Sequence, residues 1–569
     1  MPRYTVFVWV IVLGLILGGC QPQGQGSARE SGGQKPAGFK RIVAAVQDEI
    51  PIVYHTLNPS SRFRGVDGVQ DLVAAGLTQL NREGGGVAEL AEAVPSLENG
   101  LWKLAPDGTM ELTWNIKPNA QWHDGTPFTA EDLIFTLQVI RDPEVPIFGN
   151  TAYAYIGGIR AADARTVTVS WNQPYIHADW LFSATLGLPF PKHLLEQAYT
   201  ERKMAFTEEP YWGQNYVGTG PYKLKDWQLG SHLVVSAFDG FVLGRPKVDE
   251  IEVRFVADDE TLAANLLAGS IDVILGRSIS GPQATHIRDL WQGAGRMEAS
   301  YSTWIALYPQ LIDPNPAVML NLQFRQAVLH GINRQELADE LLPGQSSVAD
   351  SWLLPGQPQF REIEERNVIR YAYDPRKAEE LLTGLGYAKG ADGMYADRSG
   401  NKLVIEVRTT AGDDLREKML LAIMDYWKQI GLTGTPVLIP RQQAQDQQYR
   451  ATFPGFELNR NPPDERGNVN LHSRNIPSFE NEFRVTGNRS RYRNAEMDAL
   501  VERYFVSIPM QERNEVMGQI VKHVSENLPI VAIMYDGIPT LVSSRLINVG
   551  AGGASGTQAW NSYAWDVKG

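Results

Sequence analysis

The sequence predicts an α/β protein with mixed sheets, and three observations support this fold class. Some segments alternate apolar and polar residues, as half-buried strands do, and others have apolar residues at helical spacing. The two kinds of segment alternate along the chain. The composition, 43% hydrophobic and 21% charged, is that of a globular protein. A chain of 569 residues is longer than a single hydrophobic core usually stabilises, so we expect more than one domain.

Most of the predicted strands lie in the first half of the chain. Alternating or short apolar runs predict strands over 41–46, 111–116, 166–171, 223–227, 233–237 and 251–256. Helices are predicted over 72–80 and over 260–267, and the second of these begins with an acidic turn.

The second half of the chain is predicted to be richer in helices. The expected helices cover 322–333, 335–342, 375–385 and 415–430, with one strand over 403–408. In the last helix, one face carries Met419, Ala422, Ile423, Tyr426 and Trp427. We interpret this face as core, and Gly431 as the residue that ends the helix.

The segment 122–132 gives the clearest local signal of a helix start. Asp124 and Gly125 favour a tight turn, Thr129 is a good N-cap, and two acidic residues follow it where the helix dipole favours negative charge. His123 stands beside Asp124, as an acid/base pair would. We interpret His123 as a structural part of the turn, because a capped helix follows it directly.

Motifs of the common enzyme classes are missing from the sequence. There is no serine nucleophile elbow, no His-Glu-x-x-His zinc motif, no P-loop and no calcium loop, and the nine histidines are scattered singly. The run 84–86 is Gly-Gly-Gly without the lysine of a phosphate loop, so it predicts a mobile turn. We therefore expect no enzyme and no cofactor.

The charge distribution argues against nucleic acid as a partner. The net charge is −13, and no dense run of Lys and Arg appears. The stretch 484–493 holds four arginines, but Thr, Gly, Asn and Ser dilute them, and we interpret it as a surface loop.

The N-terminus resembles a bacterial lipoprotein signal peptide. Residues 5–19 are almost uninterruptedly apolar, follow Arg3 and end in Leu17-Gly18-Gly19-Cys20, a run shorter than the roughly 20 residues of a bilayer span. Cleavage before Cys20 would leave this cysteine to carry the lipid. The alternative is an uncleaved anchor helix with an incidental cysteine. Residues 21–38 are rich in Gly, Gln and Ser and predict a flexible tether with a reach of about 20–25 Å.

Cys20 is the only cysteine in the sequence. The folded part can therefore hold no disulfide, no cysteine-ligated zinc and no cysteine nucleophile.

A series of short motifs stands in the order of a known family. They are Leu57-Asn58-Pro59, 112–117 leading into 122–132, Val217-Gly218-Thr219-Gly220-Pro221-Tyr222, 266–272, 324–334, 373–378 ahead of 385–387, 494–498 and Leu528-Pro529-Ile530. With these motifs the chain resembles the extracellular solute-binding proteins of the peptide/nickel (oligopeptide-binding, family 5) ABC importers. The resemblance implies a two-lobed periplasmic-binding-protein fold of class II type, with a hinge and an extra small domain in the first lobe.

The family resemblance also implies domain boundaries. Residues 1–20 would be the signal peptide and 21–39 the tether. The first-lobe core would combine 40–80 with 215–300 and 525–569, the additional subdomain would cover 81–214, and the second lobe 301–524.

A ligand site is implied in the cleft between the lobes. In peptide-binding members an acidic residue after a tryptophan holds the peptide amine, and the comparable stretch here, 453–460, offers Phe456 and Glu457. It lacks the Trp and the Asp-Tyr pattern, so peptide specificity stays open. The further predicted ligand residues are Tyr54, Trp304, Trp352, Arg441 and Arg460. Trp304 has an alternative role in the core, and Arg460 as a solvated side chain.

The function implied is that of the binding component of an ABC importer. Its partners would be an oligopeptide or related small molecule, a permease with its ATPase, and the membrane through the lipid anchor, with the protein extracytoplasmic and monomeric. A metal site assembled from distant loops stays open, because relatives bind nickel complexes and haem. The alternatives are a sensory receptor that uses the same cleft and a secreted hydrolase with carboxylate chemistry.

Overall fold

The structure is a computed structural model, and it describes residues 38–54, 65–147, 151–440, 442–461, 469, 471–484, 487–553 and 557–568. The compact unit of the chain covers Lys40–Gly569. Cys20, the predicted signal peptide and Arg441 lie outside the described residues. Among the described residues, no helix is both long enough and apolar enough to cross a membrane.

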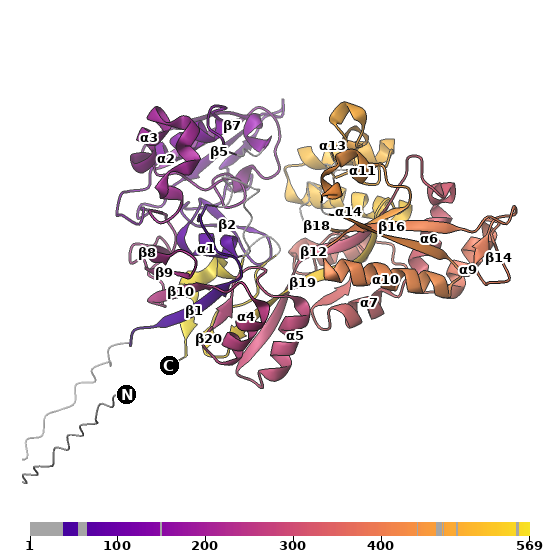
Figure 1. Ribbon diagram of the computed structural model, residues 1–569. Coiled ribbons are helices and arrows are strands. Elements are labelled where there is room, and N and C mark those ends of the chain that lie inside the picture. Colours follow the sequence, from indigo (N-terminus) through magenta and orange to yellow (C-terminus); the bar gives the residue numbers. More distant parts are fainter. Residues whose placement is uncertain are drawn as a thin grey trace, which may run out of the picture. The chain divides into compact units, whose positions relative to one another are not determined.

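One large mixed sheet organises the molecule (Figure 1). Its strand order is β17-β16-β18-β12-β19-β11-β1-β10-β9-β8, and β13 pairs with β19 off this path. The bounds are β1 Arg41–Val46, β8 Tyr222–Gln228, β9 His232–Ala237, β10 Glu250–Phe255, β11 Val273–Ile274, β12 Gly295–Pro309, β13 Ser346–Val348, β16 Val404–Thr410, β17 Thr433–Ile439, β18 Phe456–Asn461 and β19 Val531–Ser543.

The two longest strands of this sheet, β12 and β19, form its antiparallel centre. On one side β11, β1 and β10 are parallel to one another, and β9 and β8 follow them antiparallel. On the other side β18, β16 and β17 are parallel. We call the set from β11 to β8 the first half of the sheet, and the set from β18 to β17 the second half.

Smaller sheets add to this frame. A four-stranded antiparallel sheet has the order β4-β5-β7-β6. Its strands are β4 Trp102–Leu104, β5 Met110–Asn115, β6 Ile156–Ala161 and β7 Thr166–Trp171. The two-stranded sheets pair β2 Thr78–Leu80 with β3 Gly86–Ala88, β14 Ala388–Lys389 with β15 Tyr395–Ala396, and β20 Leu546–Ile547 with β21 Asp566–Val567.

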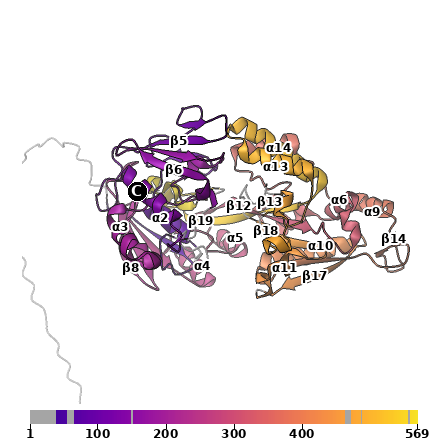
Figure 2. The same ribbon diagram turned by 90° about the horizontal axis from the view of Figure 1, so that it is seen from above.

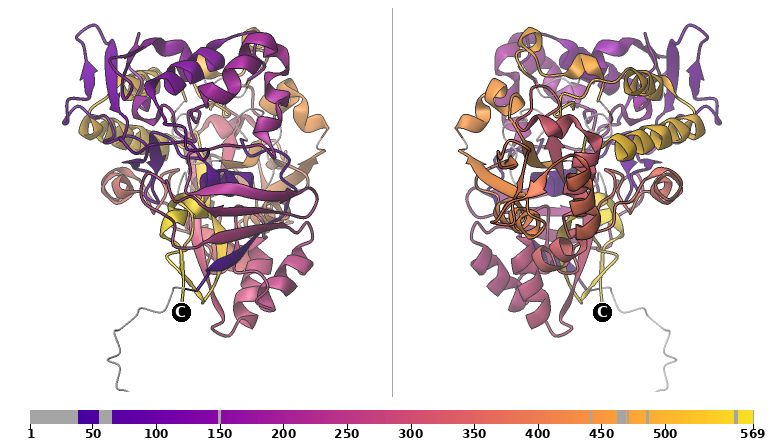
Figure 3. Two further views of the ribbon diagram at one scale, coloured as in Figure 1. Left: turned by 90° about the vertical axis from the view of Figure 1, so that its left-hand side faces the viewer. Right: turned by 90° about the vertical axis from the view of Figure 1, so that its right-hand side faces the viewer.

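Helices cover the large sheet from both faces, as the two end-on views show (Figure 3). They are α1 Val66–Val73, α2 Ala130–Arg141, α3 Lys192–Glu201, α4 Asp259–Leu267, α5 Gly281–Leu290, α6 Leu322–His330, α7 Arg334–Leu341, α8 Pro358–Asn367, α9 Pro375–Gly384, α10 Asp414–Gln429, α11 Gln447–Ala451, α13 Ala495–Val506 and α14 Met510–Asn527.

Separate apolar clusters stabilise the parts of the molecule. One lies on the first half of the sheet, and a second packs the second half against α6 and α10. A third cluster runs from the four-stranded sheet to α13 and α14, and it includes Trp304 of β12. Successive residues of β12 therefore face different cores, because Ile305 belongs to the cluster under α10.

The predicted strands and most predicted helices are confirmed, with ends that differ by a few residues. Thr129 caps α2 in a capping box with Asp132. Burial lowers the pKa of His123 to about 4, while its ring accepts a hydrogen bond from the Gly218 N–H and contacts the carbonyl oxygen of Gly220. The structural interpretation of His123 is therefore confirmed.

The predicted helix over 72–80 is wrong. Helix α1 ends at Val73, the backbone is extended at Ala74, and residues 78–80 form β2. The backbone N–H and carbonyl of Ala75 bind the hydroxyl of Thr219 instead of helical partners. A contact with a residue 144 positions away thus outweighs the local apolar spacing.

The stretch 484–493 is also not the simple surface loop that was predicted. Asn488 and Ser490 are fully buried, and the Asn488 amide donates to the carbonyls of Leu471, His472 and Tyr492. The guanidinium of Arg489 pairs with Glu457. Polar composition was misleading here, because these side chains are satisfied inside the protein.

Candidate functional site

The pairing register brings the carboxyl ends of both parallel strand sets to the middle of the β12–β19 pair. Val273 of β11 pairs with Val542 of β19, and Val542 also pairs with Arg296 near the start of β12. From the level of Arg296, β11 runs toward the centre of β12. Strand β18 runs the opposite way and ends with Asn461 opposite Trp304. Residues that follow β11 and residues that end β18 therefore approach the same level of β12. Ligands of open α/β sheets bind outside the carboxyl ends of parallel strands.

Five charged side chains gather at this place: Arg277 after β11, Asp413 after β16, Arg416 in α10, Arg460 in β18 and Asp536 in β19. We call them the carboxyl-end cluster. They come from both halves of the sheet and from its central pair.

Arg460 is the centre of the carboxyl-end cluster. Its Nη1 pairs with Asp413, and its Nε lies 2.5 Å from Oδ2 of Asp536. The same oxygen of Asp536 accepts the hydroxyl of Thr303 of β12 at 2.9 Å. The Nε of Arg416 donates to Asp413 at 3.0 Å. Arg460 thus bridges the start of α10 to the central strand β19.

The charges set the protonation of Asp413. Burial alone would raise the pKa of this carboxyl, but the charges of Arg460 and Arg416 outweigh burial and hold it below its ordinary value. Asp413 is also the N-cap of α10 and accepts the Arg416 N–H at 3.2 Å, a position where the helix dipole favours an anion.

Arg277 approaches the cluster from the first half of the sheet. Its side chain is exposed, and yet surrounding protein lowers its pKa through desolvation, while Asp536 opposes this shift and Arg460 adds to it. Asp67, exposed in the first turn of α1, is a further charge that acts on Arg277. Arg277 therefore lies within electrostatic reach of Asp536 and Arg460, although it starts from the other half of the sheet.

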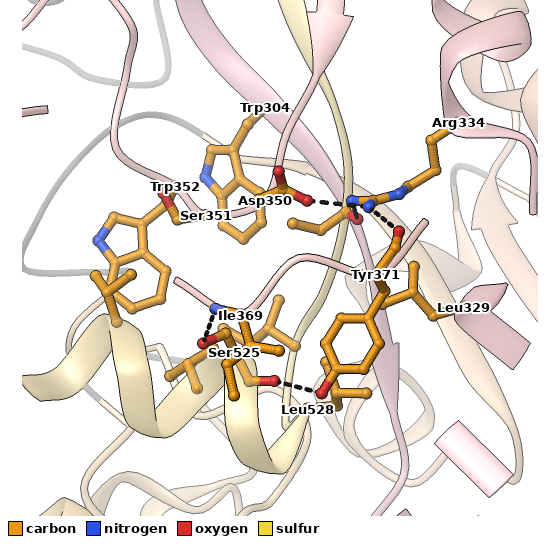
Figure 4. A pocket seen from close by; sticks show the side chains of 14 residues that line it. Trp304, Leu329, Arg334, Asp350, Ser351, Trp352, Ile369, Tyr371, Ser525 and Leu528 are labelled. Carbon is orange, nitrogen blue, oxygen red and sulfur yellow. Dashed lines mark hydrogen bonds and ion pairs between the residues drawn. The ribbon is translucent and has the colours of Figure 1, made fainter. Parts of the chain in front are cut away.

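Two predicted ligand residues, Trp304 and Trp352, lie on the other face of the sheet. Their ring centroids are 6.4 Å apart, and both indole N–H groups are buried without a hydrogen-bond partner. They line a cavity together with Arg334, Asp350, Tyr371 and residues of α14 (Figure 4). The space open to the centres of water molecules there is about 20 Å³, enough for one or two waters and too little for a solute.

Tyr54 also has a place in the core. It is 3% exposed and packs against Phe190 and Trp212, with ring centroids 5.5 and 5.6 Å away. The residues that follow it, 55–64, lie outside the described part of the chain.

Phe456 and Glu457 lie at the amino-terminal end of β18, away from the carboxyl-end cluster. Phe456 is fully buried in the cluster under α10 and packs on Trp427. Glu457 is 1% exposed and pairs with Arg450 and with Arg489, whose Nη1 lies 3.0 Å from the carboxylate. In this structure the carboxylate of Glu457 is thus held by two arginines that are each 17% exposed, and its role at a ligand stays a prediction.

Of the five residues in the carboxyl-end cluster, the sequence analysis named Arg460 and did not name Arg277, Asp413, Arg416 and Asp536. Two of these had a usable signal, because Asp413 caps a predicted helix directly after a predicted strand, and Arg277 follows Leu275 and Gly276 at the end of a short apolar run. Asp536 had none, since it interrupts a long apolar strand without any change of pattern.

Comparison with known proteins identifies the family. Residues 92–477 match the family described as bacterial extracellular solute-binding proteins, family 5, middle. The chain belongs to this family. This match confirms the predicted family. Family 5 proteins are extracytoplasmic binding proteins rather than enzymes.

Relatives with known ligands share the fold. The oligopeptide-binding protein AppA of Bacillus subtilis is 21% identical over 542 residues, which cover 92% of each chain. The oligopeptide-binding protein of Thermus thermophilus complexed with a pentapeptide has a TM-score of 0.64 at 23% identity and covers 93% of this chain and 96% of its own. NikA of Brucella suis in complex with Fe(III)-EDTA has a TM-score of 0.72 at 18% identity and covers 93% and 100%. The predicted two-lobed α/β fold is confirmed.

Within the described residues, no group of three or more His, Cys, Asp or Glu side chains has an arrangement that could hold a metal ion.

Proposed function

We propose that this protein is the solute-binding component of an ABC importer and that it captures an oligopeptide or a related small molecule at the carboxyl-end cluster. The observation that carries the proposal is the position of Arg460 between Asp413 and Asp536, with Arg277 reaching the same level of the sheet from the other half. A solute there would touch both halves of the sheet at once.

The central strands supply the hinge of this mechanism. The β12–β19 ladder has register shifts between Tyr301 and Thr303 and between Ile305 and Ala306, close to the level of the carboxyl-end cluster. Such irregularities bend a sheet locally. A solute that binds the closed form more tightly than the open form shifts the hinge equilibrium, and a permease can then distinguish the loaded protein from the empty one.

The boundaries of the lobes and the anchor belong to the same proposal. The first-lobe core combines 40–80 with 215–300 and 525–569, the subdomain covers 81–214, and the second lobe covers 301–524. Lipid on Cys20 and the tether over 21–39 hold a monomer beside the permease and its ATPase. Replacing Cys20 by Ser is then expected to move the protein from the membrane fraction to the soluble fraction of the cells.

Mixed charge at the cluster supports a solute that carries both charges. Arg416 and Arg460 pair with Asp413, Arg460 also pairs with Asp536, and the charges of Asp536 and Asp67 act on Arg277. Peptides and metal chelates of amino acids carry such charges. Arg460 is 28% exposed and pairs with two carboxylates, Asp413 and Asp536.

Native mass spectrometry tests the proposal. The chain from Lys40 onward is purified, and its mass is compared with that of the same protein after unfolding and dialysis. A discrete additional mass that disappears on unfolding identifies the solute directly. A clean mass, followed by no thermal shift with peptides, amino-acid chelates or sugars, would contradict solute capture.

A further inference from the structure

A side chain of α14 contacts the segment that follows the four-stranded sheet. Nη1 of Arg513 donates to the carbonyl oxygen of Ile176 at 3.1 Å, across 337 positions of sequence. Helix α14 lies beside the four-stranded sheet in the view from above (Figure 2). Apolar residues surround the contact, because Ile176 and Ala178 belong to the same apolar cluster as Val516 and Met517 of α14.

The two partners of this contact belong to parts of the molecule that a hinge would move separately. Helix α14 packs on α8 and α13 and leads directly into β19. The segment of Ile176 follows β7, and its short 3-10 helix Ala178–Trp180 contacts β2. Under the proposed boundaries, Arg513 is in the second lobe and Ile176 in the subdomain of the first.

The segment that receives Arg513 is held by contacts that do not involve α14. The hydroxyl of Thr78 donates to the carbonyl oxygen of Asp179 at 3.0 Å. The ring of His177 stacks on Trp180 with centroids 4.0 Å apart, and Tyr175 stacks on Trp171 at 5.2 Å. A fixed acceptor loses little entropy when a cation docks on it.

Charge favours the same pairing. Burial raises the pKa of Asp179 to about 7, and Arg513 is the charge that opposes this shift. The guanidinium therefore lies where it binds a carbonyl oxygen and also favours the ionised carboxylate. Separating the two parts would leave that carboxylate without its cation.

We propose that Arg513 and the segment 176–179 form a latch between the lobes, which stabilises the closed form and raises the affinity for the solute. The effect of the latch on affinity rests on the proposed function. The existence of the latch does not depend on the proposed function. It is separate from the carboxyl-end cluster, so it acts on closure without touching the solute.

The test measures the distance between the lobes without any solute. Spin labels are placed on the full chain carrying Cys20→Ser, through Leu229→Cys in the turn between β8 and β9 and Leu421→Cys in α10, which are 63% and 60% exposed. Arg513→Gln is expected to shift the distance distribution toward longer values and to weaken solute binding about tenfold, the usual weight of a charge-assisted hydrogen bond.

A matched control and a second variant make the test decisive. Arg503→Gln removes a bond of similar length, from Arg503 Nη2 to Gln519 Oε1 at 3.1 Å, between α13 and α14 of one lobe, and is expected to leave the distances unchanged. Asp179→Asn is expected to shift them in the same direction as Arg513→Gln but by less. Identical distances in Arg513→Gln and the parent chain would overturn the latch.

The outcomes separate the latch from the proposed function. A shift in Arg513→Gln, together with a clean mass in native mass spectrometry and no thermal shift with peptides, amino-acid chelates or sugars, supports the latch and contradicts solute capture. A bound solute with unchanged distances and affinity in Arg513→Gln supports capture and contradicts the latch.

Discussion

Strand β18 carries two clusters of arginine and carboxylate side chains that differ in burial. Glu457, near its start, is 1% exposed and pairs with Arg450 and Arg489. Arg460, three residues later, has 28% of its side chain exposed and pairs with Asp413 and Asp536. The chemistry of the two clusters is the same, but the first is enclosed in one half of the sheet and the second lies where both halves meet.

The difference separates stability from function. The Glu457 cluster holds two largely buried cations, each 17% exposed, on one buried carboxylate, so loss of that carboxylate leaves two poorly solvated charges without their partner. The Arg460 cluster keeps contact with solvent, and water can replace a lost partner there. We therefore expect substitutions at Glu457 to affect folding and substitutions at Arg460 to affect binding.

The largest expected effect tests the buried cluster. Glu457→Gln should lower the free energy of unfolding by about 3–5 kcal/mol, because it leaves the largely buried Arg450 and Arg489 without their anion. Urea unfolding followed by tryptophan fluorescence measures it. Glu480→Gln, at an exposed carboxylate that accepts one hydroxyl, is the control and should change stability little. A loss below 1 kcal/mol for Glu457→Gln would remove the distinction between the clusters.

The second prediction concerns the exposed cluster. Arg460→Gln should weaken binding of the solute found by native mass spectrometry at least tenfold, while it lowers stability by no more than about 1 kcal/mol. Asp413 keeps Arg416, and Asp536 keeps the hydroxyl of Thr303, so both carboxylates retain a partner. Calorimetric titration beside urea unfolding measures both quantities. The opposite pattern, lost stability with full affinity, would make Arg460 a structural residue.

Arg277 gives a smaller and more selective effect. Arg277→Gln should weaken binding several-fold without a change in thermal stability, because its exposed side chain contributes little to the fold. Arg288→Gln, at a half-exposed arginine of α5 paired with its neighbour Asp289, is the matched control and should change neither quantity. Equal affinity in both variants would exclude Arg277 from the site.

The smallest effect is on the titration of Asp413. Its pKa is lowered in the folded protein, so its contribution to stability is present above the unfolded pKa and is lost as the pH falls through the lowered value. Arg460→Gln should move this titration to higher pH, because it removes a charge that lowers the pKa of Asp413. Carboxyl carbon NMR resolves the shift. Arg450→Gln serves as the comparison, and an equal shift there would show that the two clusters are electrostatically coupled.

The sequence predicted the fold well where the signal is local. The capped start of α2 and the apolar face of α10 depend on residues a few positions apart, and both were found. Helix α1 was misplaced because the Thr219 hydroxyl, far away in sequence, binds the backbone of Ala75. The site was only partly predictable for the same reason. Asp536 and Arg277 become site residues through the register of β11 and β19, which leaves no local mark.

Strand β19 has a consequence for the order in which the chain folds. It pairs with both β11 and β12, and it is made of residues 531–543, near the C-terminus. Strands β1, β10 and β11 are synthesised early, but the ladder that joins them to the centre of the sheet stays incomplete until almost the whole chain has left the ribosome. The first half of the sheet is therefore joined to the centre of the sheet only through residues 531–543.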